Sequence, residues 1–311
     1  MTGQNQRGFR VYIIDTHVHV WARAEVPQPW IDPDTMAAID RDFSPTNYTE
    51  ALEESGHAER VRGTVLVQTV HSTEETEYLL SVAAGSTRIR GVVGWVDLLD
   101  PEVDAEVARL RALAGGSKLV GIRHQIQEEE GDGLLAHPRA DQAFDALERA
   151  GLAFDLVIRA DQIEAAARVA AAHPRVTFVL DHLGKPPLAT KNQLLLDEWA
   201  GNLRRFASSP NTFAKLSGLS VEANWSTWEA MDMAFPVATA VDSFGAERLM
   251  FGSDWPVLRL AGDFRRWLAT VEALTGHLVE NQRNDIWCGS AQRAYQLDMT
   301  DCEEGQGHAG V

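Results

Sequence analysis

The stretch IIDTHVHVW, residues 13–21, places two histidines two positions apart behind an aspartate, at the end of an apolar run. Alternate side chains of an extended strand share one face, so His17 and His19 point the same way and Val18 points the opposite way. The apolar run itself is typical of a strand that is covered on both faces. The stretch therefore predicts a buried strand with two imidazoles at its C-terminal end.

Seven further runs of apolar, β-branched residues recur along the chain. Near-continuous runs of this kind are what parallel strands require when both faces of the sheet are covered. The predicted strands span residues 11–17, 63–69, 90–97, 119–125, 153–158, 176–182, 212–218 and 248–254.

Segments with helical periodicity separate these strands. In DPEVDAEVARLRALAGG, residues 100–116, Asp100 is placed to cap a helix, Pro101 falls in its first turn and Gly115 follows its end. We expect Pro236 to kink one of the later helices. The other predicted helices span residues 140–151, 160–173, 226–244 and 261–275.

Eight strand–helix units in 311 residues predict a (β/α)8 TIM barrel that forms a single domain. The alternative is a doubly wound open sheet, which normally carries a glycine-rich turn after its first strand, and no such turn follows here. We expect an N-terminal extension over residues 1–10, the barrel over 11–297 and a loose polar tail over 298–311.

The composition limits the class of partner. A net charge of −17 disfavours nucleic acid and anionic membranes, and no run of about 18 apolar residues predicts a membrane span. The first ten residues lack the apolar core of a signal peptide, and Cys288 and Cys302 alone do not suggest a secreted disulfide framework. We expect a cytoplasmic monomer or homodimer that acts on a small molecule.

Polar residues gather where the predicted strands end. In a (β/α)8 barrel these C-terminal ends form the active site, so the clustering predicts an enzyme. The residues concerned are His17, His19, Gln68, His71, Trp95, Asp97, Arg123, His124, Gln125, Asp155, His182, Lys215, Ser217 and Asp254.

Four of these residues form a plausible ligand set for one divalent ion. His17, His19 and His182 offer imidazole nitrogens and Asp254 offers a carboxylate, a combination that zinc accepts with a position left open for water. The alternatives are a hydrogen-bonded histidine pair and, for Asp254, a carboxylate that caps a helix or lies in a loop.

Other strand-end residues are candidates for substrate binding. Arg123 offers a planar fork of donors to a substrate anion or hydroxyl, and its alternative partner is Asp155 on the adjacent strand. Gln68 is expected in the pocket, whereas His124 either joins it or faces the helices. Because the first connection, residues 21–48, is unusually long, we expect it to shape the mouth. Apolar stacking on a ring is expected from Trp21, Trp30, Trp95 and Trp255.

Two residues keep several interpretations. His71 is more simply a surface histidine beside a helix than a pocket residue. Lys215 is a catalytic amine, a substrate ligand or one partner of an ion pair in the barrel interior, which is the commonest outcome for a lysine in such a strand.

Six motifs, in order, resemble those of the amidohydrolase superfamily, and more closely its lactonase-like branch of L-fuconolactonase- and L-rhamnonolactonase-like enzymes. The resemblance runs from about residue 11 to 296. The motifs are DTHVHVW, GVVGWVDL, VGIRHQIQ, VLDHLGKP, KLSGL and FGSDWPV.

The resemblance implies a (β/α)8 barrel in which water attacks a lactone, most simply that of a sugar acid. Asp254 would act as the general base, while His17, His19 and His182 polarise the carbonyl directly or through one divalent ion, preferably zinc. A two-metal site is not expected, because Arg123 with His124 and Asp155 replace the residues that binuclear members carry on strands four and five.

Two other functions remain open at this point. One is a metal-dependent decarboxylase or amide hydrolase of the same superfamily. The other is a barrel that binds a sugar acid without catalysis, which predicts ligand binding with no release of protons.

Overall fold

The protein is a (β/α)8 barrel, as the sequence predicts. The computed structural model describes residues 12–299, in which eight parallel strands pair in the order of the chain. Residues 1–11 and 300–311, including Cys302, lie outside the described residues, as do the predicted N-terminal extension and most of the predicted tail. The strands are β1 (Ile13–Val18), β2 (Val61–Val67), β3 (Ile89–Gly94), β4 (Leu119–His124), β5 (Ala153–Leu156), β6 (Phe178–Leu180), β7 (Thr212–Leu216) and β8 (Leu249–Phe251).

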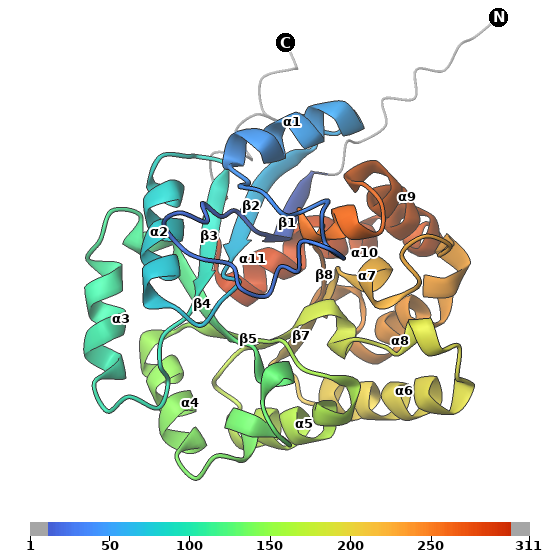
Figure 1. Cartoon of the computed structure of the whole chain (residues 1–311). Coiled ribbons are helices and arrows are strands. Elements are labelled where there is room, and N and C mark those ends of the chain that lie inside the picture. Colours follow the sequence, from blue (N-terminus) through green and yellow to red (C-terminus); the bar gives the residue numbers. More distant parts are fainter. Residues whose placement is uncertain (1–11, 300–311) are drawn as a thin grey trace, which may run out of the picture.

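Helices surround the strands (Figure 1). Among residues 12–299, no helix combines the length and apolar character that a membrane span requires. The helices are α1 (Pro45–Ser55), α2 (Thr73–Ala84), α3 (Val103–Arg111), α4 (Ala140–Ala150), α5 (Ile163–Ala172), α6 (Gln193–Ala207), α7 (Leu219–Glu222), α8 (Ala234–Phe244), α9 (Phe264–Thr275), α10 (Glu280–Asn284) and α11 (Ser290–Tyr295).

The apolar side chains form two clusters. The larger cluster fills the space between strands and helices. The smaller cluster combines residues from six of the strands with residues of α11 and the segment that follows it, up to Met299. Met299 is buried, so the chain is packed at least two residues beyond the predicted barrel boundary at 297. The smaller cluster comprises Ile14, Val65, Val67, Val93, Ala153, Val179, Met250, Ala291, Ala294, Tyr295, Leu297 and Met299.

The barrel closes between β1 and the segment after β8. The Asp254 N–H donates to the His17 carbonyl over 2.8 Å, and the His19 N–H donates to the Trp255 carbonyl over 2.7 Å. The Thr16 hydroxyl adds a bond of 2.7 Å to the Phe251 carbonyl. The two segments that carry the histidine pair and Asp254 are therefore held side by side.

Several strands end earlier than predicted. β6 stops at Leu180 and β8 at Phe251, because His182 and Asp254 adopt left-handed backbone conformations that no strand accommodates. The predicted helix over 226–244 is wrong for residues 226–233. A 3-10 turn over Ala230–Met233 precedes α8, which places Pro236 in the first turn of α8, where proline is tolerated, and not at a kink.

Candidate active site

The C-terminal ends of the strands surround a cavity of about 240 Å³, the expected place for a ligand. His19, Arg123, His182 and Asp254 line it. A cavity of about 290 Å³ between α1 and α9 contains none of these residues. Apolar, uncharged polar and charged side chains also line the strand-end cavity. The apolar ones are Trp30, Met36, Val157, Val221, Trp225, Val257 and Leu260, the uncharged polar ones are Thr69, Gln125 and Gln127, and the charged ones are Glu128, Lys185 and Glu222.

Asp254 faces the histidine pair. Its backbone φ of 61° is uncommon for a residue other than glycine, and strain of this kind concentrates at functional sites. Its Oδ1 lies 3.4 Å from Nε2 of His19 and 3.7 Å from Nε2 of His17. Burial raises the pKa of Asp254, whereas the positive charge that His182, His19 and His17 carry when they are protonated lowers it, so that the net shift of this pKa is downward. The carboxylate is therefore ionised at neutral pH.

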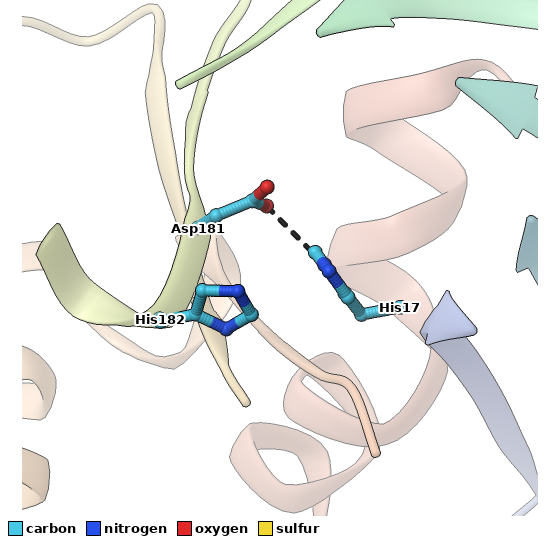
Figure 2. Close-up of side chains that lie close together, drawn as sticks. All are labelled: His17, Asp181 and His182. Carbon is cyan, nitrogen blue, oxygen red and sulfur yellow. Dashed lines mark ion pairs between the residues drawn. The ribbon is translucent and has the colours of Figure 1, made fainter. Parts of the chain in front are cut away.

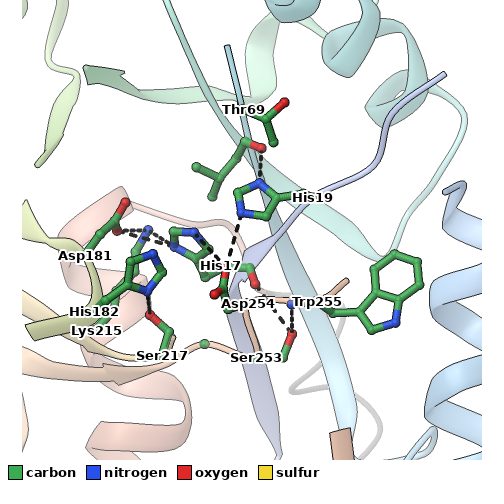
Figure 3. Close-up of polar contacts among 12 residues, drawn as sticks. His17, His19, Thr69, Asp181, His182, Lys215, Ser217, Ser253, Asp254 and Trp255 are labelled. Carbon is green, nitrogen blue, oxygen red and sulfur yellow. Dashed lines mark hydrogen bonds and ion pairs between the residues drawn. The ribbon is translucent and has the colours of Figure 1, made fainter. Parts of the chain in front are cut away.

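The tautomer of His19 is set by a backbone carbonyl. Its Nδ1 lies 2.7 Å from the Val67 oxygen, which can only accept, so in the neutral ring Nδ1 carries the proton and Nε2 presents a lone pair. Figure 3 shows this ring between the carbonyl and Asp254. The lone pair on His19 Nε2 and the negative charge on Asp254 repel each other, and a cation bound between them would remove this repulsion.

His17, His19 and Asp254 fit one divalent ion. Their ligand atoms all lie within 4.8 Å of one another. Burial lowers the pKa of His17 well below its ordinary value, so its ring is neutral, as a metal ligand must be. Two imidazole nitrogens and one carboxylate oxygen are donors that zinc accepts. The fourth predicted ligand, His182, belongs to a different group.

His182 lies with His17 and Asp181 (Figure 2). This second group already contains a cation, because the Lys215 ammonium lies 2.9 Å from Asp181 Oδ1 and 3.2 Å from His17 Nδ1. Lys215 also pairs with Asp155 over 2.6 Å. Of the three interpretations of Lys215, the structure therefore shows the interior ion pair.

His182 packs directly against the turn after β7. Its Nδ1 lies 2.9 Å from the Ser217 hydroxyl. A Cβ on Gly218 would come within 2.3 Å of the same nitrogen, and Gly218 has a φ of +65°. Glycine at 218 is therefore required for both the backbone conformation and the position of the His182 ring.

Arg123 is held from two sides. It donates to Asp181 Oδ2 over 3.1 Å and to the Gln68 carbonyl, and it lies at the cavity. The alternative pairing of Arg123 with Asp155 is wrong, because Asp155 is fully buried and its Oδ2 accepts from Lys215 and from the Tyr295 hydroxyl.

The structure does not bring every predicted substrate residue to the cavity. Gln68 lies behind it and donates to the Arg123 carbonyl over 3.0 Å. His124 faces away from the cavity, because it follows Arg123 on β4 and neighbouring side chains of a strand point opposite ways. Its two ring nitrogens accept from Trp95 and contact Glu129 at 2.6 Å, so neither His124 nor Trp95 lines the cavity. Of the four tryptophans expected at the mouth, Trp30 lines the cavity, whereas Trp255 is buried against Phe43 and Tyr48, Trp21 against Phe43, and Trp95 stacks on His71.

Sequence reasoning missed Asp181. It directly precedes His182 in VTFVLDH, and strand alternation would turn the two side chains to opposite faces. The left-handed conformations of His182 and Leu183 break that alternation, so both side chains reach the site. The available signal for Asp181 is its position next to the predicted ligand His182 at the end of a strand.

Fold and site together define a barrel that gathers histidine and aspartate side chains at the C-terminal ends of its strands. A family model described as amidohydrolase matches residues 14–297, and the chain belongs to this family.

Two relatives and one solved structure illustrate the similarity. The chain is 36% identical over 289 residues to an L-fucono-1,5-lactonase of Burkholderia ambifaria, covering 92% of this chain and 96% of that protein. It is also 36% identical over 293 residues to an L-fucono-1,5-lactonase of Burkholderia multivorans, covering 91% and 96%. A crystal structure of an amidohydrolase from Burkholderia multivorans with bound zinc matches with a TM-score of 0.84 and 33% identity, covering 92% of this chain and 100% of that one.

Proposed function

We propose that the protein hydrolyses a sugar-acid lactone, of the L-fuconolactone or L-rhamnonolactone type. The observation that carries this proposal is the carboxylate of Asp254, which faces two imidazole nitrogens beside the strand-end cavity. The similarity to two L-fucono-1,5-lactonases over more than nine tenths of each chain supports the choice of a cyclic ester.

Asp254 acts as the general base. The oxygen of a water molecule bonds to the lactone carbonyl carbon while Asp254 accepts the water proton. The bond from that carbon to the ring oxygen then breaks, and Asp254 returns the proton to this oxygen, which leaves as a hydroxyl group. The product is an open-chain hydroxy acid.

His17, His19 and Asp254 would hold one divalent ion, preferably zinc, because their donors converge and His19 presents a lone pair in a fixed direction. When bound, the ion supplies a Lewis acid for the carbonyl oxygen and lowers the pKa of a bound water. A zinc-bound relative of the same fold supports this choice of metal. His182 and Arg123 line the same cavity and offer donors to the lactone oxygens.

The cavity lining offers the substrate both apolar surface and hydrogen-bonding groups. Trp30, Met36 and Trp225 provide apolar surface for the face or the deoxy carbon of a sugar ring. Thr69, Gln125 and Gln127 offer hydrogen bonds to its hydroxyl groups.

The test is a hydrolysis screen over sugar 1,4- and 1,5-lactones, in which a pH indicator detects the acid that is formed. Each reaction is run with and without prolonged chelator treatment. Acid formation that is lost on chelation and restored by zinc supports both the lactonase activity and the metal site. Acid formation that survives chelation overturns the proposed metal site and assigns polarisation of the carbonyl to the imidazoles alone.

If no lactone yields acid, the lactonase proposal is overturned. Decarboxylation of aromatic acids and hydrolysis of amides are then the next reactions to test. Lactone binding without any release of protons would identify a non-catalytic barrel.

A further inference from the structure

His17 is more closely surrounded than its partner His19. The ring is fully buried, and each of its nitrogens meets one acidic and one basic group. Asp181 Oδ1 lies 3.4 Å from Nδ1 and Lys215 Nζ 3.2 Å from it. Arg123 Nη1 lies 3.3 Å from Nε2 and Asp254 Oδ1 3.7 Å from it. A neutral imidazole carries one proton, so these neighbours decide which nitrogen holds it.

The distances favour a proton on Nδ1. Lysine and arginine only donate, and carboxylates only accept. A proton on Nδ1 has Asp181 Oδ1 as its nearest acceptor at 3.4 Å, and Nε2 then accepts from Arg123. The Lys215 ammonium also lies 3.2 Å from Nδ1, but it has the carboxylates of Asp155 and Asp181 as acceptors for its own protons. A proton on Nε2 would find only Asp254 at 3.7 Å, beyond hydrogen-bond distance, and would face the Arg123 donor.

We propose that Asp181 is a positioning residue: it accepts the Nδ1 proton of His17 and so leaves Nε2 with a lone pair, which lies between Arg123 and Asp254 on the side where His19 also presents Nε2. This inference rests on the proposed metal site. Carboxylates that accept from a ligating histidine orient its ring and raise its basicity, and Asp181 would play for His17 the part that the Val67 carbonyl plays for His19.

Asp181 is itself clamped from two strands. Lys215 of β7 lies 2.9 Å from Oδ1, and Arg123 of β4 donates to Oδ2 over 3.1 Å. Lys215 is anchored in turn by Asp155 Oδ2 at 2.6 Å, which also accepts from the Tyr295 hydroxyl over 2.7 Å. All of these side chains are buried, so the position of Asp181 is well determined.

Asp155 is a matched control for Asp181. Both are fully buried aspartates that pair with Lys215, one at the end of β5 and the other after β6. Only Asp181 reaches His17. A loss of buried charge or a disturbance of Lys215 would affect both variants, whereas an effect on the histidine belongs to Asp181 alone.

The experiment compares wild type, Asp181→Asn and Asp155→Asn. Zinc affinity is measured by competition with a chromophoric chelator, and thermal unfolding reports whether each variant is folded. We expect Asp181→Asn to weaken zinc binding by roughly tenfold to a hundredfold, as the loss of such partners does in other sites. We expect no comparable loss in Asp155→Asn. Equal losses in the two variants, or none in Asp181→Asn, overturn the proposal.

A measurement on the unmodified protein guards against unfolded variants. Nitrogen-15 spectra of histidine-labelled protein, with the His17 signals assigned by comparison with His17→Gln, report which ring nitrogen carries the proton. A proton on Nδ1 supports the proposal, and a proton on Nε2 in the metal-free protein overturns it whatever the zinc result. If wild type binds no zinc, the metal part of the proposed function fails separately, and the proposed role of Asp181 in metal binding fails with it.

Discussion

The two ends of the barrel interior contrast in chemistry. The layer next to α11 consists of aliphatic side chains from β1, β2, β3, β5, β6 and β8, closed by Tyr295, Leu297 and Met299. The layer at the strand ends holds three imidazoles, three carboxylates and two cations. Apolar packing and burial dominate at one end, while hydrogen bonding and charge dominate at the other.

The backbone differs in the same way. The strand residues of the aliphatic layer keep extended backbones, although the pairing of β1 with β2, β2 with β3 and β3 with β4 contains register shifts. At the polar end, in contrast, His182, Leu183 and Asp254 adopt left-handed conformations. Division of the barrel into a stabilising end and a reactive end explains why substitutions at the two ends should affect different measurements.

The largest expected effect is at the polar end. Asp254→Asn removes the proposed base and should lower kcat by roughly a hundredfold to ten-thousandfold, the usual contribution of a general base. Steady-state hydrolysis of the best lactone, with saturating zinc, measures this loss. Thermal unfolding serves as the control for folding, and near-normal kcat would exclude Asp254 as the base.

The opposite end is tested by Met250→Ala. Met250 on β8 is fully buried in the aliphatic layer. Its truncation leaves a cavity and should destabilise the fold by about 2–5 kcal/mol. Denaturant unfolding measures the change, and kcat of the folded protein should stay close to that of wild type. A large fall in kcat would show that the two ends are not separable.

A smaller effect is expected at the cavity wall. Trp30 lines the cavity, stands edge-on to Trp21 and donates to the Gln28 side chain over 2.8 Å. Trp30→Ala should raise KM by roughly tenfold with less change in kcat, because the indole binds substrate and reaction intermediate alike. Trp30→Phe keeps the aromatic surface and should restore most of the affinity. Equal kcat losses in both variants would contradict a binding role.

The same contrast explains what the sequence predicted. Eight apolar runs correspond to the regular part of the barrel, where periodicity and burial determine structure. His17, His19 and Asp254 were also predicted to lie together, because residues at the ends of neighbouring strands in a closed barrel must meet. Their convergence on one point agrees with that reasoning.

Prediction failed where the chain leaves regular geometry. Asp181 was missed because alternation does not survive the left-handed turn at His182. Trp255 was expected at the mouth, yet packs between Phe43 and Tyr48, because the segment after β8 turns its indole away from the strand-end cavity. The direction of a side chain in such turns depends on contacts between distant segments, which spacing along the chain does not encode.

His71 provides the smallest and most specific test. Its ring stacks on Trp95, and its Nε2 accepts from the backbone N–H of Gln125 over 2.9 Å. Gln125 in turn lines the strand-end cavity. The His71 side chain is exposed, but partial desolvation of its ring and the neighbouring His124 lower the pKa of His71 to about 4. His71→Phe keeps a stacked ring but loses the acceptor, which should cost about 0.5–1.5 kcal/mol of stability at pH 7, the usual contribution of one hydrogen bond.

The pH dependence follows from this lowered pKa. Between the folded pKa near 4 and the ordinary value of 6.5, the unfolded chain binds more protons at His71 than the folded chain does. The contribution of the neutral ring is therefore complete above pH 6.5 and declines as the pH falls toward 4. Denaturant unfolding at pH 7 and pH 5 should show a smaller difference between wild type and His71→Phe at pH 5. If the difference in unfolding free energy is unchanged or larger at pH 5, the unprotonated Nε2 of His71 does not stabilise the protein by accepting from the Gln125 N–H.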